Sequence, residues 1–446
     1  MILKRLALSA AFAAAVLSSG LATSVAMAQG AVQFFPSLTG RTGPVAPNAT
    51  PFANGYWDYM KLVNERGGIN GVRTLVEECE TAYLTDRGVE CYERLKNRHG
   101  GATVFQPLST GITFALTSLV PNDRIPLITS GYGRSDSADG GIFKWNFPLI
   151  GHYWVAGDVV LQHLANQEGG WDKLRGKRIA VGFHDSPFGR ELLPILRQRS
   201  TMHGFTLQEF PIPAPGVEQR SIWLQIRQSR PDYVILQTWG VMTPTAIREA
   251  IATGFPRERI FGTWWSGAEP DLRDIGQAAR GYNAVMMQHG SAKDSAVVRA
   301  ILEQVHGKGN GTGPREEVGD VLYMRGVVGA MLATEGVFRA QERFGKGQRM
   351  TGEQARWGYE NLNITQARLN ELGFDGVLRG PIATSCDDHM GSSFARIHRW
   401  TGNGFEWVSD FLEGDEEIMR PMVRASADQY ARETGWTRRP ASDCDS

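Results

Sequence analysis

Short apolar runs alternate with helix-length amphipathic segments along most of the chain. The runs expected to form strands are residues 33–36, 73–78, 101–107, 126–131, 177–183, 232–238 and 259–264. The intervening segments have the length and periodicity of helices, for example residues 54–66, 113–120, 189–202, 221–230 and 243–253. Strands and helices that alternate at this spacing predict βαβ units and parallel sheets, so the expected fold class is α/β.

The expected strands fall into two groups, separated at about residues 147–152. Residues 151–280 repeat the strand–helix order of residues 32–147, which indicates two similar lobes rather than a short-repeat solenoid. A long helix is expected at residues 320–342. Late antiparallel strands are expected at residues 380–382, 394–400 and 405–408, with a turn at residues 401–404.

The first 28 residues have the features of a secretory signal peptide. Lys4 and Arg5 form a basic start, residues 6–21 are apolar and rich in alanine, and Ala-Met-Ala at 26–28 supplies the small residues of a cleavage site. The expected cut is before Gln29. A membrane anchor is the alternative, disfavoured by the short apolar run, and no later segment is apolar over ~18 residues.

The composition fits a two-domain globular protein. Removing 28 of the 446 residues leaves 418, which exceeds what one hydrophobic core usually serves. The signal peptide carries two of the 47 basic residues, so 45 basic residues face 47 acidic ones and the net charge is −2. The sequence has no basic stripe, and nucleic acid is therefore not an expected partner.

Four cysteines, Cys79, Cys91, Cys386 and Cys444, lie in the exported part. An even number in an oxidising compartment suggests two disulfides, and sequence proximity favours Cys79–Cys91 and Cys386–Cys444. Four free buried thiols are the alternative. No pair has C-x-x-C spacing, so neither a zinc site nor a redox motif is expected.

The candidate binding residues follow the ends of the expected strands. In open parallel sheets ligands bind beyond the carboxyl ends of the strands, which here are followed by residues 107–111, 130–133, 184–189, 239–240 and 264–266. Four of these five segments contain an aromatic residue where polar loop residues are usual. We interpret them as walls of a ligand cleft. The Ser109–Thr110 pair suits a carboxylate or carbonyl, or is an ordinary helix N-cap.

Motifs for catalysis are scarce. The sequence lacks a G-x-S-x-G elbow, an H-E-x-x-H motif and a Walker motif, and the glycine-rich segment 307–313 lacks the context of a P-loop. His184 and Asp185 are adjacent, which favours capping or a ligand hydrogen bond over a catalytic dyad. Residues 386–389 have metal-ligand types but no spacing that closes a coordination shell. We therefore expect no enzyme activity, no cofactor and no metal.

Several stretches together resemble one known family. They are SLTGRTGP, NERGGINGVR, the Ser-Thr-Gly loop after VFQP, PLITSGYG, KRIAVGFHDSPFGRE, PDYVILQTWG, REAIATGF and FARIHRWTGNGFEWV. In order and spacing they resemble the periplasmic substrate-binding proteins of branched-chain amino-acid-type ABC transporters, such as the leucine/isoleucine/valine-binding protein.

The resemblance implies a type I periplasmic-binding fold, in which two Rossmann-like lobes with parallel sheets are joined by a three-strand hinge. Lobe 1 would comprise residues 29–150 and 288–378, lobe 2 residues 151–287 and 379–436, and residues 437–446 a polar tail. The ligand would be clamped between the lobes. By position, the first lobe's face of the cleft would carry Ser109, Thr110, Ser130 and Tyr132, and the second lobe's face Phe188, Trp239 and Trp265.

The function implied by the resemblance is that of a monomeric periplasmic protein that delivers a small-molecule solute to the membrane permease of an ABC importer. A periplasmic sensor for a membrane receptor and an exported hydrolase are the alternatives. Amino-acid binders of this family hold the ligand ammonium with a carboxylate after the strand that ends near Thr263. Here Trp264 and Trp265 follow, and the nearest acid is Glu269. An aromatic or flat compound, an amide, or a cation stacked on rings is therefore expected rather than a branched-chain amino acid.

Overall fold

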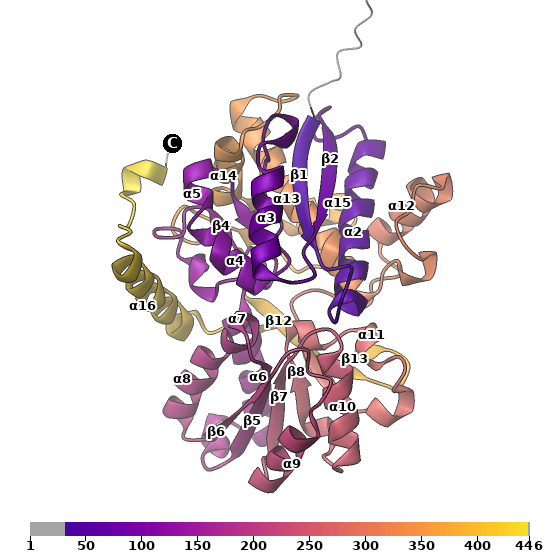
Figure 1. Ribbon diagram of the computed structural model, residues 1–446, viewed down its shortest axis with the longest axis vertical. Coiled ribbons are helices and arrows are strands. Elements are labelled where there is room, and N and C mark those ends of the chain that lie inside the picture. Colours follow the sequence, from indigo (N-terminus) through magenta and orange to yellow (C-terminus); the bar gives the residue numbers. More distant parts are fainter. Residues whose placement is uncertain (1–31, 445–446) are drawn as a thin grey trace, which may run out of the picture.

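The computed structural model describes residues 32–444, which fold into two lobes stacked along the long axis of the molecule (Figure 1). The expected signal peptide and its cleavage site before Gln29 lie outside the described residues. The α/β class and the division into two lobes with mostly parallel sheets are confirmed.

The first lobe is built on a parallel arrangement of short strands. They are β1 (Val32–Thr39), β2 (Arg73–Glu80), β3 (Leu127–Ile128) and β4 (Asn146–Phe147), with β1 paired to β2 and β3 to β4. The expected strand at residues 101–107 joins these pairs through isolated bridges, Ser37 to Gln106 and Phe105 to Leu127. It therefore lies within the sheet without forming a regular strand of its own.

Helices cover this sheet, and the longest two pack closely together. They are α2 (Ala46–Glu65), α3 (Thr85–Leu95), α4 (Thr110–Thr117), α5 (Val120–Asp123), α12 (Ala296–Gln304), α13 (Val321–Phe344), α14 (Gly352–Glu360) and α15 (Gln366–Leu372). A Cβ on Gly326 of α13 would lie 1.9 Å from the carbonyl oxygen of Phe52 on α2, so this contact requires glycine. Helix α13 is long and apolar enough to span a membrane, but 94% of its apolar window is buried inside the protein.

Helix α2 begins eight residues earlier than the hydrophobic pattern predicted, at Ala46 rather than residue 54. Residues 46–53, which lie outside the expected helix, are therefore helical. Pro47 occupies the first turn, where its missing N–H group costs no intrahelical hydrogen bond.

The second lobe contains a larger mixed sheet. Its strands are β5 (Arg178–His184), β6 (Thr206–Ile212), β7 (Tyr233–Gln237), β8 (Ile260–Gly262), β9 (Asn283–Met286), β12 (Phe394–Trp400), β13 (Phe405–Trp407) and β14 (Leu412–Glu413). The order is β13-β12-β9-β8-β7-β5-β6, with β14 beside β12. Strands β5 to β9 run parallel, and β12 joins β9 antiparallel.

The helices of the second lobe are α6 (Tyr153–Glu168), α7 (Pro187–Arg190), α8 (Leu193–His203), α9 (Arg220–Ser229), α10 (Met242–Ala252) and α11 (Glu269–Leu272). Short 3₁₀ segments occur in both lobes and in the C-terminal segment. They are η1 (Arg98–Gly100), η2 (Ser135–Ala138), η3 (Trp171–Leu174), η4 (Arg257–Arg259), η5 (Trp264–Ser266), η6 (Gly276–Ala279), η7 (His306–Lys308), η8 (Arg315–Glu317) and η9 (Ala441–Cys444). The expected hairpin is confirmed for β12 and β13. The strand expected at 380–382 instead becomes β11 (Ile382–Ala383), paired with β10 (Asn363–Ile364).

The chain passes between the lobes after β4, after β9 and after β11, which agrees with the hinge expected from the resemblance. The first and last of these connections touch each other, because the amide of Gly151 donates to the carbonyl of Met390 at 3.3 Å. These two connections therefore lie side by side where the lobes can move relative to each other.

Helix α16 (Glu416–Thr434) runs along the side of the molecule and contacts both lobes (Figure 1). At its start, the Asp415 carboxylate accepts from Arg199 of the second lobe at 3.1 Å. Further along, Ser426 donates to Asp136 of the first lobe at 2.9 Å. Residues 379–436 are expected in the second lobe, and within them α16 bonds to both lobes and so forms a strap across them.

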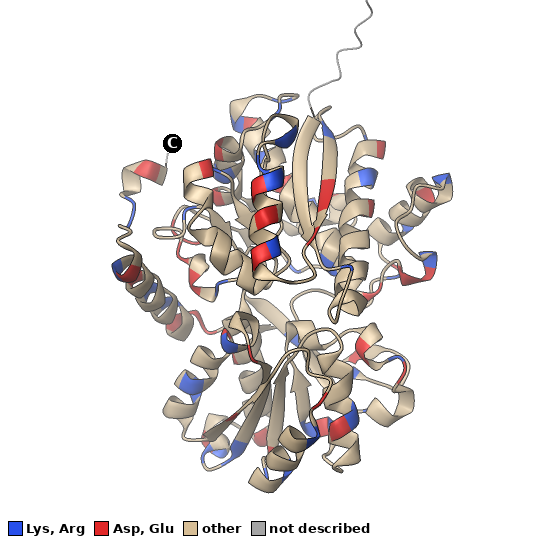
Figure 2. Cartoon of the chain, in the orientation of Figure 1, with Lys and Arg blue, Asp and Glu red and all other residues tan. Residues whose placement is uncertain are grey.

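Charged side chains of both signs are interspersed on the outer helices. Figure 2 shows red and blue segments alternating along α3, and Lys96 just beyond its end pairs with Glu93 at 2.8 Å. This distribution matches the nearly balanced totals of basic and acidic residues. Exposed pairs of this kind contribute little to stability, so the fold depends on its buried interior.

Both predicted disulfides are confirmed. Cys79 on β2 is bonded to Cys91 on α3, and Cys386 is bonded to Cys444 at the end of the described tail. Free cysteines are absent from residues 32–444. The second disulfide fastens the C-terminal segment beyond α16 to the first lobe, so this polar segment is held in place.

We predict that the Cys386→Ser/Cys444→Ser double variant loses ~4 kcal/mol of unfolding free energy. This bond closes a loop of 58 residues, and its loss frees the unfolded chain. Urea unfolding followed by tryptophan fluorescence measures the change. The matched control is Cys79→Ser/Cys91→Ser, whose loop spans 12 residues and whose expected loss is ~3 kcal/mol. Equal stability of the wild type and the first variant would contradict the prediction.

Candidate functional site

A small pocket lies where the two lobes meet, and its walls are mainly aromatic. The first lobe contributes Tyr83, Leu108, Thr110 and Tyr132, and the second lobe contributes Tyr153, Phe188, Trp239 and Trp265. The cavity between them is only about 10 Å³, roughly the room that one water molecule needs, so the walls lie close together in this structure. Ligand pockets of this fold class are concave sites between elements that follow strand ends, and this pocket meets that description.

Two lining residues have an unusual backbone conformation. Tyr83, just after β2, has φ of 64°, and Leu108, just before α4, has φ of 49°. Residues other than glycine rarely adopt positive φ, and such strain persists only where the surrounding structure enforces it. At Leu108 the enforcing contact is a hydrogen bond of 2.9 Å from its amide to the Tyr132 hydroxyl. A contact between two residues of the pocket wall therefore maintains the strained conformation of Leu108.

Hydrogen bonds within the walls occupy most of their polar atoms. The Tyr153 hydroxyl lies 2.8 Å from the Thr110 hydroxyl, and the Tyr132 hydroxyl donates to the carbonyl of Ile128 at 3.3 Å. Burial raises the pKa of Tyr132 and of Tyr153 well above the usual value, so both hydroxyls stay protonated. The indole N–H of Trp239 is buried and has no hydrogen-bond partner. The protein therefore provides no acceptor for this N–H group.

Trp265 connects the two sides of the pocket. Its indole N–H donates to the carbonyl of Gly131 in the first lobe at 3.1 Å. Its ring meets Tyr132 edge-on with centroids 5.7 Å apart, and meets Trp239 edge-on at 5.0 Å. A further ring contact across the lobes joins Tyr83 and Trp239 at 6.3 Å. These separations suit favourable aromatic pairs, which stabilise the closed arrangement of the lobes.

The structure brings together most of the residues that the sequence analysis proposed. Thr110, Tyr132, Phe188, Trp239 and Trp265 line the same pocket. Ser109 and Ser130 are not in that lining. The Ser109 hydroxyl accepts from the amide of Ile112 at 3.3 Å, so it caps α4. Ser130 is buried near Gly329 of α13.

Three lining residues were missed, namely Tyr83, Leu108 and Tyr153. Tyr83 follows β2 and Tyr153 follows β4, so both lie just beyond strand ends. Their position beyond a strand end is the sequence signal that marks both as candidates, as it does for the other lining loops.

Acidic side chains near the pocket are engaged elsewhere. Asp185 forms an exposed ion pair with Arg190. Glu269 accepts from the amide of Val321 at 3.0 Å and from Ser291 at 2.7 Å, so it caps α13. Within residues 32–444, no charged side chain lines the aromatic pocket.

The motifs at residues 184–185 and 386–389 have structural roles. His184 is half-buried and meets Phe188 edge-on, with ring centroids 6.1 Å apart. Cys386 is in a disulfide, and His389 is buried with Nδ1 2.8 Å from the carbonyl oxygen of Asn146. No group of three or more His, Cys, Asp or Glu side chains suited to a metal ion occurs in the described part of the chain.

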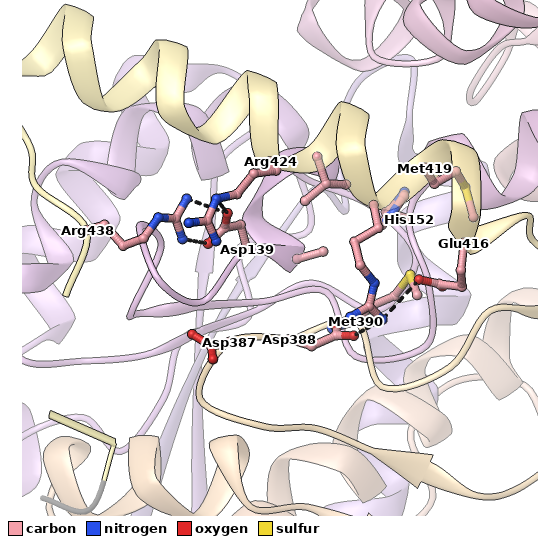
Figure 3. A pocket seen from close by; sticks show the side chains of 12 residues that line it. Asp139, His152, Asp387, Asp388, Met390, Glu416, Met419, Arg424 and Arg438 are labelled. Atoms are coloured by element: carbon pink, nitrogen blue, oxygen red, sulfur yellow. Dashed lines mark hydrogen bonds and ion pairs between the residues drawn. The ribbon is translucent and has the colours of Figure 1, made fainter. Parts of the chain in front are cut away.

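A larger groove lies between α16 and the connections of the hinge (Figure 3). Its charged residues pair with one another. Arg438 binds Asp139 at 2.7 Å, and Arg420 lies 3.3 Å from both Asp388 and Glu416. The Arg420–Asp388 pair fastens α16 to the first lobe, and the Arg438–Asp139 pair fastens the segment that follows α16. The groove is not at the carboxyl ends of the strands, and we assign it to packing of the strap.

The lobes are also joined by a buried polar contact behind the pocket. Asn48 of α2 donates to the carboxylate of Asp271 on α11 at 3.0 Å, and the amide of Ala268 donates to the same carboxylate at 3.2 Å. Burial raises the pKa of Asp271 to about 7, although both hydrogen bonds act in the opposite direction. Ionisation of this group therefore costs the closed protein free energy.

Residues 34–404 match the model of a family described as periplasmic binding protein. A crystal structure from the Pseudomonas fluorescens group, described as an ABC transporter permease, is 36% identical, with 92% of this chain and 100% of that chain covered and a TM-score of 0.85. The comparison with curated proteins gave no match.

Two more distant structures share the fold. A branched-chain amino acid ABC transporter protein from Thermus thermophilus with bound valine is 22% identical, with 88% of this chain and 98% of that chain covered and a TM-score of 0.74. A solute-binding protein from R. palustris in complex with 4-hydroxybenzoate is 15% identical, with 86% and 97% covered and a TM-score of 0.67.

We predict that Asp271→Asn stabilises the protein increasingly as the pH rises from about 4 to about 7. Below this window the Asp271 carboxyl is protonated in both folded and unfolded chains. Within it the unfolded chain loses the proton first, so wild-type stability falls, by up to ~4 kcal/mol relative to the variant. Asn48 can rotate its amide to match the new side chain, because its Oδ1 has no partner. Urea unfolding at pH 4.5, 6 and 7.5 measures the difference, and parallel pH profiles would refute this account.

Proposed function

The chain belongs to the periplasmic binding protein family, and we propose that it is the solute-binding component of an ABC importer. In this proposal the protein is exported, loses residues 1–28 by cleavage before Gln29, and works in the periplasm as a monomer. It binds a small organic solute between its lobes and delivers it to a membrane permease. Its role is binding rather than catalysis.

The observation that carries the proposal is the aromatic pocket at the junction of the lobes. Its lining comes from loops beyond the strand ends of both lobes, so a molecule bound there contacts both. A solute that binds the closed arrangement better than the open one shifts the population towards closure. Closure is thereby the signal by which a permease distinguishes loaded from empty protein.

The solute class follows from the chemistry of the walls. Six of the eight lining residues are aromatic, and their surfaces suit a planar molecule. The free indole N–H of Trp239 suits a hydrogen-bond acceptor on that molecule. Proteins of the same fold have been crystallised with valine and with 4-hydroxybenzoate. The pocket here favours an aromatic or otherwise flat solute over an aliphatic amino acid.

The first experiment is a thermal-shift screen of the mature protein with amino acids, amides, urea analogues and aromatic acids. A solute at 100 times its Kd adds ~2.7 kcal/mol of stability, which such a screen detects. Conversion of the solute during the assay, followed by chromatography, would contradict a binding-only role.

We predict that Trp239→Ala weakens binding of the solute so identified at least tenfold, which is ~1.4 kcal/mol. The variant removes a wall of the pocket and a hydrogen-bond donor. Isothermal titration calorimetry measures the loss. The matched control is Trp171→Ala, because Trp171 lies on the second lobe away from the pocket and stacks on His203 at 4.1 Å. Equal affinities of the wild type and Trp239→Ala would show that the solute binds elsewhere.

We also predict that leucine, isoleucine and valine do not bind at micromolar concentration. Their ammonium group would be buried among side chains that carry no counter-charge, since Asp185 and Glu269 are engaged elsewhere. Calorimetry with the three amino acids is sufficient. Micromolar binding of any of them would mean that an acid reaches the pocket when the solute is bound.

A further inference from the structure

A buried guanidinium lies directly behind the aromatic pocket. Arg325 of α13 is 1% exposed, and its Cζ lies 4.2 Å from the ring centroid of Trp264 and 4.9 Å from that of Trp265. The arginine belongs to the first lobe and the two tryptophans to the second. Trp265 therefore contacts the pocket on one side and the cation on another.

The protein does not neutralise this cation by direct pairing. Nε and Nη1 of Arg325 are buried without a hydrogen-bond partner, and Nη2 has only the sulfur of Met286 at 3.5 Å. No ion pair of Arg325 with an acid occurs among the described residues. Burial lowers its pKa to about 9, which leaves it cationic at neutral pH. Burial of a charge without a directly bonded counter-ion costs free energy, although stacking on two indoles recovers part of that cost.

The two nearby carboxyl groups are already occupied. Glu269 caps α13 and accepts from Ser291, and Asp271 accepts from Asn48 and from the amide of Ala268. Burial raises the pKa of both acids, that of Asp271 to about 7, so the negative charge of Asp271 is diminished near neutral pH. Both acids act on the Arg325 charge from a distance, but neither forms an ion pair with it.

The lining residues and the Arg325–Trp264 pair behind them leave only donors among their buried polar atoms without a partner. Among the lining residues and the Arg325–Trp264 pair behind them, the buried polar atoms without a partner are Nε1 of Trp239, Nε1 of Trp264, and Nε and Nη1 of Arg325. Each is an N–H donor. A carboxylate is a planar group with acceptors only, and it complements such a set.

We propose that the cleft accepts an organic carboxylate with a planar body, and that Arg325 supplies its counter-charge. This inference rests on the proposed function and narrows the solute to an anion. It reverses the sign expected for an amino-acid binder, in which an acid after the corresponding strand would hold an ammonium. It also disfavours the stacked cation that the aromatic walls alone would allow, because Arg325 repels it.

The test compares acids with their neutral isosteres. Benzoate, phenylacetate and cinnamate are each measured against the corresponding amide by calorimetry, with the wild type, Arg325→Met and Arg325→Lys. We expect the wild type to bind at least one acid tenfold or more tightly than its amide. Arg325→Met should reduce that preference to less than about threefold, and Arg325→Lys should retain most of it, because lysine keeps the charge.

An arginine that only supports the two indoles gives a different result. In that case Arg325→Met weakens acid and amide equally and leaves their ratio unchanged, which would overturn the proposal. Circular dichroism checks that each variant is folded. If Arg325→Met does not fold, the wild-type comparison still decides, since an amide that binds as tightly as its acid refutes an anion site.

Absence of binding by all three acids would also count against the proposal. The proposed solute-binding function fails separately. It stands if the wider screen finds a different solute whose affinity is lost in Trp239→Ala and kept in Trp171→Ala, and it falls if no solute depends on Trp239. The two inferences are thus tested by different variants and different ligands.

Discussion

The contacts of one indole, that of Trp265, hold the two lobes together around the pocket. Its N–H bonds to Gly131 of the first lobe, its edge meets Tyr132, and Arg325 stacks on it from behind. Trp265 reaches this position because β8 ends at Gly262 and is followed at once by the 3₁₀ turn η5. The point at which β8 ends in the second sheet therefore determines where Trp265 contacts the first lobe.

Closure of the lobes exchanges water for ring contacts and a few buried polar bonds. Removing apolar surface from water favours it, at roughly 25 cal/mol per Å². Burial of Asp271, Arg325 and the free indole N–H groups opposes it. A solute that fills the pocket and pairs with those donors adds to the first effect and reduces the second. This balance explains how a site with so few free polar groups can still select its ligand.

Much of the architecture followed from the sequence because strand ends and loop positions are local properties. Alternating apolar runs located the strands, and the loops after them contain Thr110, Tyr132, Phe188, Trp239 and Trp265, which the structure gathers at one pocket. Arg325 gave no such signal, because it lies inside the long helix α13 and meets the tryptophans only through tertiary packing. The path of α16 could not be predicted either, because it too depends on tertiary packing. An amphipathic helix indicates that it packs, but not on which lobe.

The most direct test is a crystal structure of the mature protein with the solute identified by the binding screen. The account predicts a planar molecule enclosed between Tyr132 of the first lobe and Trp239 of the second, with its acceptor atoms turned towards the indole N–H groups and Arg325. Electron density for the solute in the groove beneath α16, or on one lobe alone with the aromatic pocket unchanged, would contradict it.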